Sequence, residues 1–128
     1  MQSKYILAMA AIILITGTVL IKNNNHATTE TTGENVSIVA NQQIIALEAK
    51  GGFFPTMSVA KAGVPSILRV STNGTYDCSS ALSIPSLSYR ANLPPTGTTD
   101  IEIPAQTAGT TINGTCSMGM YSFSISFE

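Results

Sequence analysis

The chain has 128 residues, a formal net charge of −1 and only 10% charged residues. This length suits one domain, and the lack of a basic stripe argues against nucleic acid as a partner. The only histidine is His26, and the acidic residues are scattered singly. No Ser-His-Asp set, pair of imidazole ligands or acid–base pair can be built, so we expect neither an enzyme nor a small-molecule substrate.

The first 22 residues form the most apolar segment of the chain. An uncharged run from Tyr5 to Ile21 is bounded by Lys4 and Lys22, which predicts a single transmembrane helix within residues 1–22. No small-x-small cleavage motif follows it, which favours an uncleaved cell-membrane anchor over a secretory signal. The flanking lysines are too evenly balanced to decide on which side of the membrane the rest of the chain lies.

Residues 23–33 are rich in Asn and Thr and have no apolar periodicity. They cannot bury enough surface to offset ordering, so they predict a flexible polar tether. The remaining residues, 34–128, are predicted to form one domain.

Within 34–128 the hydrophobic period is two, which is typical of β-strands. Large side chains alternate with serines from Tyr121 to Phe127, and further strands are predicted at 44–47, 57–59, 64–71 and 101–103. Turn signals such as Asn73-Gly74 and Asn113-Gly114 recur at short intervals. Short strands at this spacing predict an all-β sandwich, and a domain this small gains from a disulfide or metal staple.

Chemistry is concentrated in the segment Cys116-Ser117-Met118-Gly119-Met120, with Cys78 further upstream. Thiolate and thioether sulfurs are soft ligands that favour copper(I). In an extended backbone residues two apart point the same way, so Cys116, Met118 and Met120 can converge on one ion. The remaining methionine of the domain, Met57, is predicted to be a core residue first and a ligand second.

Two other readings of the same residues remain open. Cys78 and Cys116 can form a structural disulfide in a metal-free extracytoplasmic sandwich, with Met118 and Met120 as core residues. An electron-transfer cupredoxin is the other alternative, but it needs two imidazole ligands for copper(II). Since His26 lies in the predicted tether, the residues argue against that reading.

Four motifs in order carry a resemblance to a known family: Gly52-Phe53-Phe54-Pro55, Val59-Ala60-Lys61-Ala62-Gly63-Val64-Pro65, Cys78-Ser79-Ser80-Ala81-Leu82-Ser83-Ile84-Pro85 and Cys116-Ser117-Met118-Gly119-Met120. Together they resemble the cupredoxin-like domains of bacterial copper-handling proteins. With the N-terminal anchor added, the chain is similar to the CupA-type membrane-anchored copper(I) chaperones.

This resemblance implies a cupredoxin-like Greek-key β-sandwich that follows a single transmembrane helix. Cys78 and Cys116 would be the primary ligands, with Met118 and Met120 as thioether ligands, for one or two copper(I) ions. The implied function is copper(I) chaperoning or sequestration in copper resistance, with a copper-exporting P-type ATPase as partner. It also favours the cytosolic face of the membrane, where thiols stay reduced.

Overall fold

The computed structural model describes residues 33–128, which contain ten β-strands, two short 3₁₀ turns and no α-helix. The predicted anchor and all but the last residue of the predicted tether lie outside the described residues. Within 33–128 there is no helix whose length and hydropathy would let it cross a bilayer.

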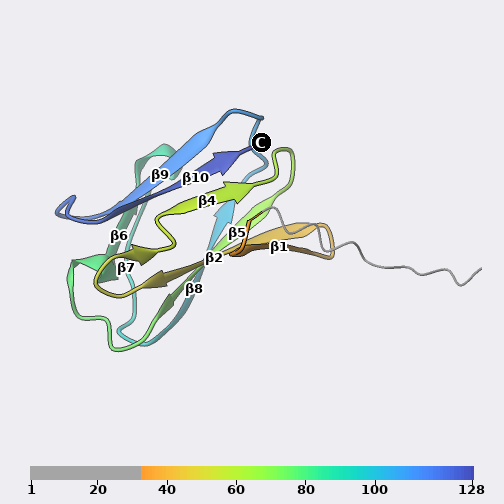
Figure 1. The fold of residues 1–128 in the computed structure, drawn as a ribbon. Helices are drawn as coiled ribbons and strands as arrows, with labels where there is room; N and C mark the ends of the chain where they lie inside the picture. The colour runs from red at the N-terminus through yellow and green to blue at the C-terminus, as the bar shows by residue number, and fades with distance from the viewer. Residues whose placement is uncertain (1–32) are drawn as a thin grey trace, which may run out of the picture.

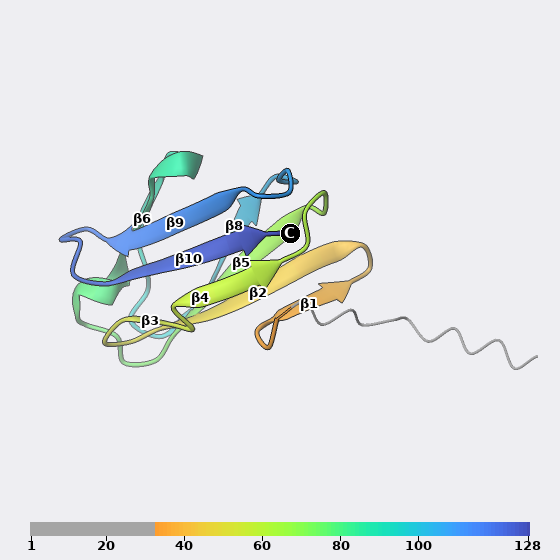
Figure 2. The same ribbon diagram turned by 45° about the horizontal axis from the view of Figure 1, so that its top comes forward.

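The strands form two mixed five-stranded sheets that lie face to face (Figures 1 and 2). The first sheet has the order β1-β2-β5-β8, with β3 also paired to β2. Its strands are β1 (Val36–Val39), β2 (Gln42–Ala49), β3 (Phe53–Phe54), β5 (Ser66–Thr72) and β8 (Gly97–Ile103). The second sheet has the order β4-β10-β9-β6-β7. Its strands are β4 (Met57–Ala60), β6 (Ala81–Ile84), β7 (Tyr89–Asn92), β9 (Thr111–Cys116) and β10 (Ser122–Phe127).

One apolar core fills the space between the sheets. In β10, Phe123, Ile125 and Phe127 are buried while the intervening serines face outward, as alternation requires of a strand with one covered face. The Phe123 ring meets Phe53 of the other sheet edge-to-face, with centroids 5.2 Å apart. The predictions of an all-β sandwich and of a strand at the C-terminus are therefore confirmed.

The turn predicted at Asn113-Gly114 is wrong, because both residues lie inside β9. Gly114 pairs with Phe123 of β10, and the Phe123 ring occupies the space that a side chain at position 114 would need. The glycine is therefore required by close packing within a strand rather than by a turn.

The two ends of the sandwich carry different elements (Figures 1 and 2). At one end lie the C-terminus, the start of β2 and the start of β5, where Gln43 pairs with Ser66. At the other end lie the end of β9, the loop from Ser117 to Tyr121 and the start of β10. The predicted sulfur ligands lie at this second end.

Candidate metal centre

Strand pairing brings Cys78 and Cys116 together from distant parts of the sequence. Cys116 is the last residue of β9 and pairs with Leu82 of β6. Cys78 begins the 3₁₀ turn η1 (Cys78–Ser80), which leads directly into β6. Their Cα atoms are 5.7 Å apart, a separation at which two cysteine side chains readily reach each other.

The structure contains this pair as a disulfide, so residues 33–128 have no free cysteine. This is the cross-link that the sequence left open as an alternative. A disulfide has no thiolate to offer a metal, since the thiolate is the form that binds soft ions. Coordination through these sulfurs requires reduction of the bond by two electrons and two protons.

A closed loop holds the Cys116 sulfur in place. The Cys116 side chain is only 1% exposed, and the Tyr121 N–H donates to its Sγ at 3.4 Å. The Cys116 N–H donates to the Tyr121 carbonyl at 3.0 Å, and the Gly119 N–H donates to the Cys116 carbonyl at 2.9 Å. Gly119 has φ 69°, a left-handed conformation that closes this turn and favours glycine. An N–H aimed at sulfur would stabilise a thiolate there after reduction.

Asp77 holds the backbone around Cys78. Its carboxylate accepts hydrogen bonds from the Ser79 hydroxyl, from the Ser79 N–H at 2.8 Å and from the Gly51 N–H at 2.9 Å. The Ser79 hydroxyl, followed by the two backbone N–H groups, lowers the pKa of Asp77 from its usual 3.8 to about 2. Asp77 therefore connects η1 to the loop before β3.

Met118 and Met120 lie in the loop after Cys116 and are 80% and 66% exposed. The alternative reading of these residues as core methionines is therefore wrong. They lie on a turn rather than on an extended strand, so the alternation that predicted their convergence with Cys116 does not apply to them. Thioethers this exposed contribute little to the core and are open to a soft ion or a partner surface.

The prediction of Met57 as a core residue is also wrong. Met57 begins the edge strand β4 and is 75% exposed. Its neighbour Ser58 takes the inward position, and the Ser58 hydroxyl accepts a hydrogen bond from Asn35 Nδ2 at 2.8 Å. The hydrogen bond between Asn35 and Ser58 therefore lies where an apolar contact of Met57 with the core was expected.

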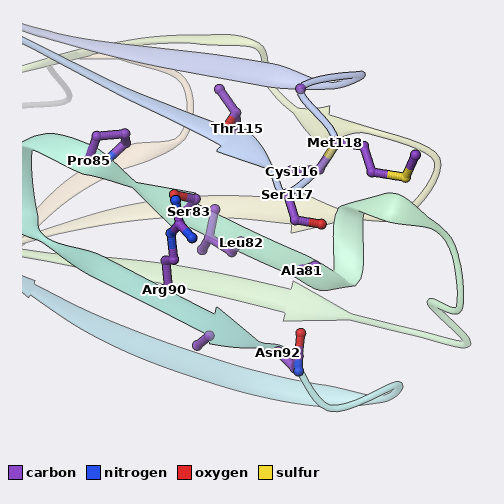
Figure 3. Close-up of a pocket in the computed structure, with 12 residues that line it drawn as sticks. Ala81, Leu82, Ser83, Pro85, Arg90, Asn92, Thr115, Cys116, Ser117 and Met118 are labelled. Carbon is purple, nitrogen blue, oxygen red and sulfur yellow. The ribbon is translucent and has the colours of Figure 1, made fainter.

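A hollow of about 590 Å³ opens beside this end of β9 (Figure 3). Cys116, Ser117 and Met118 line one part of it, and Ser83 and Arg90 line the part along β6 and β7. Sequence reasoning did not single out Ser83 or Arg90. Ser83 lies within the Cys78–Pro85 motif, but nothing in the sequence marks Ser83 or Arg90 as a functional residue, because only the register of three strands places them along the same hollow.

Among residues 33–128 there is no group of three or more His, Cys, Asp or Glu side chains placed to hold a metal ion. The soft ligands that residues 33–128 present at this end of the sandwich are the sulfurs of the two cysteines and of the two exposed loop methionines. Such an all-sulfur ligand set fits a soft monovalent ion and does not fit calcium, magnesium or an imidazole-based copper(II) site.

The described residues thus form a small two-sheet β-sandwich that carries two cysteines and two exposed methionines at one end. No protein-family model matches the chain. No curated protein matches it either.

Solved structures do resemble it. A copper-binding protein, determined by NMR in the apo form, is 25% identical with a TM-score of 0.67. The match covers 75% of this chain and 97% of that one. The metal-binding domain of the Cu(I)-exporting P-type ATPase CopA from Streptococcus pneumoniae D39, solved with Cu(I), is 17% identical with a TM-score of 0.65. That match covers 73% of this chain and 92% of the domain, and at this identity it shows a shared fold.

Proposed function

We propose that this chain is a cupredoxin-like copper(I) carrier whose reduced Cys78 and Cys116 bind the ion. The observation that carries the proposal is the placement of two cysteines, with Cα atoms 5.7 Å apart, beside a loop with two exposed methionines. The shared fold supports it, since the similar structures are a copper-binding protein and a Cu(I)-bound domain.

The ligand chemistry selects the oxidation state. Two thiolates are soft, anionic ligands and hold copper(I) tightly at low coordination number. Met118 and Met120 are neutral thioethers, so they would bind a second or shared ion more weakly. We therefore expect one tightly bound copper(I) ion and one that exchanges more readily.

This difference in affinity favours transport over catalysis. Copper(I) leaves the exposed methionines first and moves to a thiol-bearing acceptor, for which we propose a copper-exporting P-type ATPase. An N-terminal membrane anchor would raise the effective concentration of carrier at such an acceptor. The cytosolic face suits the function, because thiols stay reduced there. The physiological role would be copper resistance.

The decisive experiment is an anaerobic copper(I) titration of the reduced full chain against a competing chelator, with thiols counted beforehand. We expect two thiols and one or two bound ions. Replacing Cys78 or Cys116 with Ser should remove the tightly bound ion, because one thiolate cannot hold it alone. Stoichiometric binding that persists in both variants would contradict the ligand assignment.

The disulfide itself supports a second candidate function, a stapled surface domain without metal. The same titration separates the two candidates. A chain that regains its disulfide under cellular thiol conditions and binds no copper(I) when reduced would be a structural domain.

A further inference from the structure

The two residues of the Cys78–Cys116 disulfide differ in how far solvent reaches them. Cys116 is 1% exposed and pairs with Leu82, which is itself 2% exposed. Because paired residues of neighbouring strands point to the same face of a sheet, the Cys116 side chain faces the core. Cys78 packs against the same core but is partly exposed. A reagent that arrives from solvent therefore has access to the Cys78 side of the bond.

The segment that carries Cys78 lies at the surface on its N-terminal side. Tyr76 is 82% exposed, and Asp77 is exposed as well. The Asp77 carboxylate accepts hydrogen bonds from the Gly51 N–H at 2.9 Å and from the Ser79 N–H at 2.8 Å. These bonds fix the backbone on both sides of Cys78, so its sulfur is presented to a small molecule at a defined place.

The surroundings of Cys116 contain a group that helps its sulfur to depart. Burial by itself disfavours a thiolate. The Tyr121 N–H, however, donates to Cys116 Sγ at 3.4 Å, and such a donor stabilises the negative charge that gathers on the sulfur as the disulfide breaks. Access therefore directs attack to Cys78, and this hydrogen bond directs the departing charge to Cys116.

We propose that Cys78 is the sulfur that a small cellular thiol attacks, and that the copper site opens through a mixed disulfide on Cys78. The inference rests on the proposed function and names how that site is regulated. Cys78 is then a reversible modification site whose occupant is a thiol of low molecular mass. While Cys78 is modified, Cys116 supplies the only thiolate, so the pair does not hold copper(I) tightly.

The reaction balances over two exchanges. In the first, a small thiolate forms a bond to Cys78 Sγ as the Cys78–Cys116 bond breaks, and the electron pair of that bond goes to Cys116 Sγ. In the second, another small thiolate bonds to the small-molecule sulfur of the mixed disulfide, and Cys78 leaves as a thiolate. The two small thiols are oxidised to their disulfide, and the two cysteines are reduced by two electrons. The two protons that the small thiols lose pass to the cysteine sulfurs or to solvent.

Peptide mapping locates the attacked sulfur directly. The oxidised full chain is incubated briefly with glutathione and quenched with excess N-ethylmaleimide, which caps every free thiol. Trypsin cleaves after Arg90, so the two cysteines come away on separate peptides that mass spectrometry distinguishes. We expect about tenfold more glutathione on the peptide that carries Cys78 than on the peptide that carries Cys116, since access decides which sulfur is attacked.

The matched control is the same oxidised chain unfolded in urea, where both sulfurs are open to solvent. The preference for Cys78 should largely disappear there, because the burial of Cys116 is lost. A preference that persists unchanged in urea would show that the neighbouring sequence causes it, and it would overturn the structural assignment.

Single-cysteine variants give a second measurement that does not depend on trapping the mixed disulfide. Cys116→Ser keeps only the Cys78 thiol, and Cys78→Ser keeps only the Cys116 thiol. Each reduced variant, checked for folding by circular dichroism, reacts with dithiobis(nitrobenzoate) in buffer and in urea. Folding should slow the reaction of Cys116 about tenfold more than that of Cys78, because reactivity follows exposure. Equal slowing of the two thiols would overturn the inference.

The outcomes separate this inference from the function on which it rests. If glutathione is found equally on both peptides, or mainly on the peptide of Cys116, the assignment of Cys78 is wrong even where the reduced chain binds copper(I). If Cys78 is the attacked sulfur but the reduced chain fails the chelator titration, the proposed function is wrong, and opening of the disulfide does not regulate copper binding.

Discussion

The two ends of the sandwich treat their polar groups in opposite ways. At the end that holds the C-terminus, Gln43 is fully buried, and its Nε2 donates to Ser66 Oγ at 2.9 Å and to the Lys61 carbonyl at 3.1 Å. Its Oε1 accepts from the Lys61 N–H at 2.8 Å. This amide connects β2, β5 and the segment after β4 through hydrogen bonds that are all satisfied inside the protein.

At the other end Asp77 is satisfied in the same way, but the side chains of Ser83 and Arg90 have no hydrogen-bond or ion-pair partner within residues 33–128. There Ser83 and Arg90 line an open hollow and Met118 extends into solvent. The comparison teaches where this small domain obtains stability and where it keeps chemistry available. Satisfied hydrogen bonds stabilise one end, whereas the other end keeps two exposed thioethers accessible to solvent.

The largest expected effect comes from reducing the Cys78–Cys116 disulfide, which cross-links the end of the sandwich that carries the loop from Ser117 to Tyr121. Closing a loop between residues 38 apart in sequence should stabilise the oxidised chain by about 4 kcal/mol, mainly by restricting the unfolded state. Urea unfolding of the oxidised and reduced forms measures the difference. Copper(I) should recover part of it in the reduced form, because an ion that binds only the folded state stabilises that state. Equal unfolding midpoints for the oxidised, the reduced and the copper(I)-loaded chain would show that neither the disulfide nor the ion stabilises this end of the sandwich.

At the end of the sandwich that holds the C-terminus, Gln43→Ala should lower the free energy of unfolding by about 3 kcal/mol. The change leaves a cavity and removes the partners of the Lys61 N–H and the Ser66 hydroxyl. Copper(I) affinity, measured by chelator competition, should stay the same, since the network lies at the opposite end. A loss of copper binding that exceeds the loss of folded protein would show that the two ends are coupled.

Asp77→Asn should cause a smaller and pH-dependent loss of stability. The folded-state pKa of about 2 lies below the usual 3.8, so ionised Asp77 stabilises the fold above pH 3.8, and this contribution is lost as the pH falls through about 2. Unfolding midpoints of the natural chain and the variant should therefore differ at neutral pH and converge near pH 2. A difference that is constant over this range would rule out the carboxylate charge as its cause.

The smallest effect on stability is expected for Met118→Leu and Met120→Leu, within about 0.5 kcal/mol, because both side chains are exposed. Copper binding should respond instead, with loss of the weaker ion in the titration. Met57→Leu is the matched control, since Met57 is equally exposed but lies on β4, the edge strand farthest from β6 and β7. Unchanged stoichiometry in both loop variants would count against a thioether site.

Much of the fold was predictable from local pattern. Alternation predicted β10, and parts of β2, β4, β5 and β8, because a strand with one covered face needs an apolar residue at every second position. The sequence did not reveal that Ser58, and not Met57, takes the inward position in β4. It also did not reveal β9, because Asn113-Gly114 matches a turn pattern and its role in packing against Phe123 is visible only in three dimensions.

By itself the sequence determined that this chain folds as an all-β sandwich and that its distinctive chemistry is soft sulfur near Cys116. Both follow from residue type and local spacing. Only the tertiary structure decided that Cys78 meets Cys116, that both loop methionines face solvent, and that Ser83 and Arg90 lie beside them. These facts depend on which strands pair and in which register, and pairing between distant strands is set by the packing of the whole core.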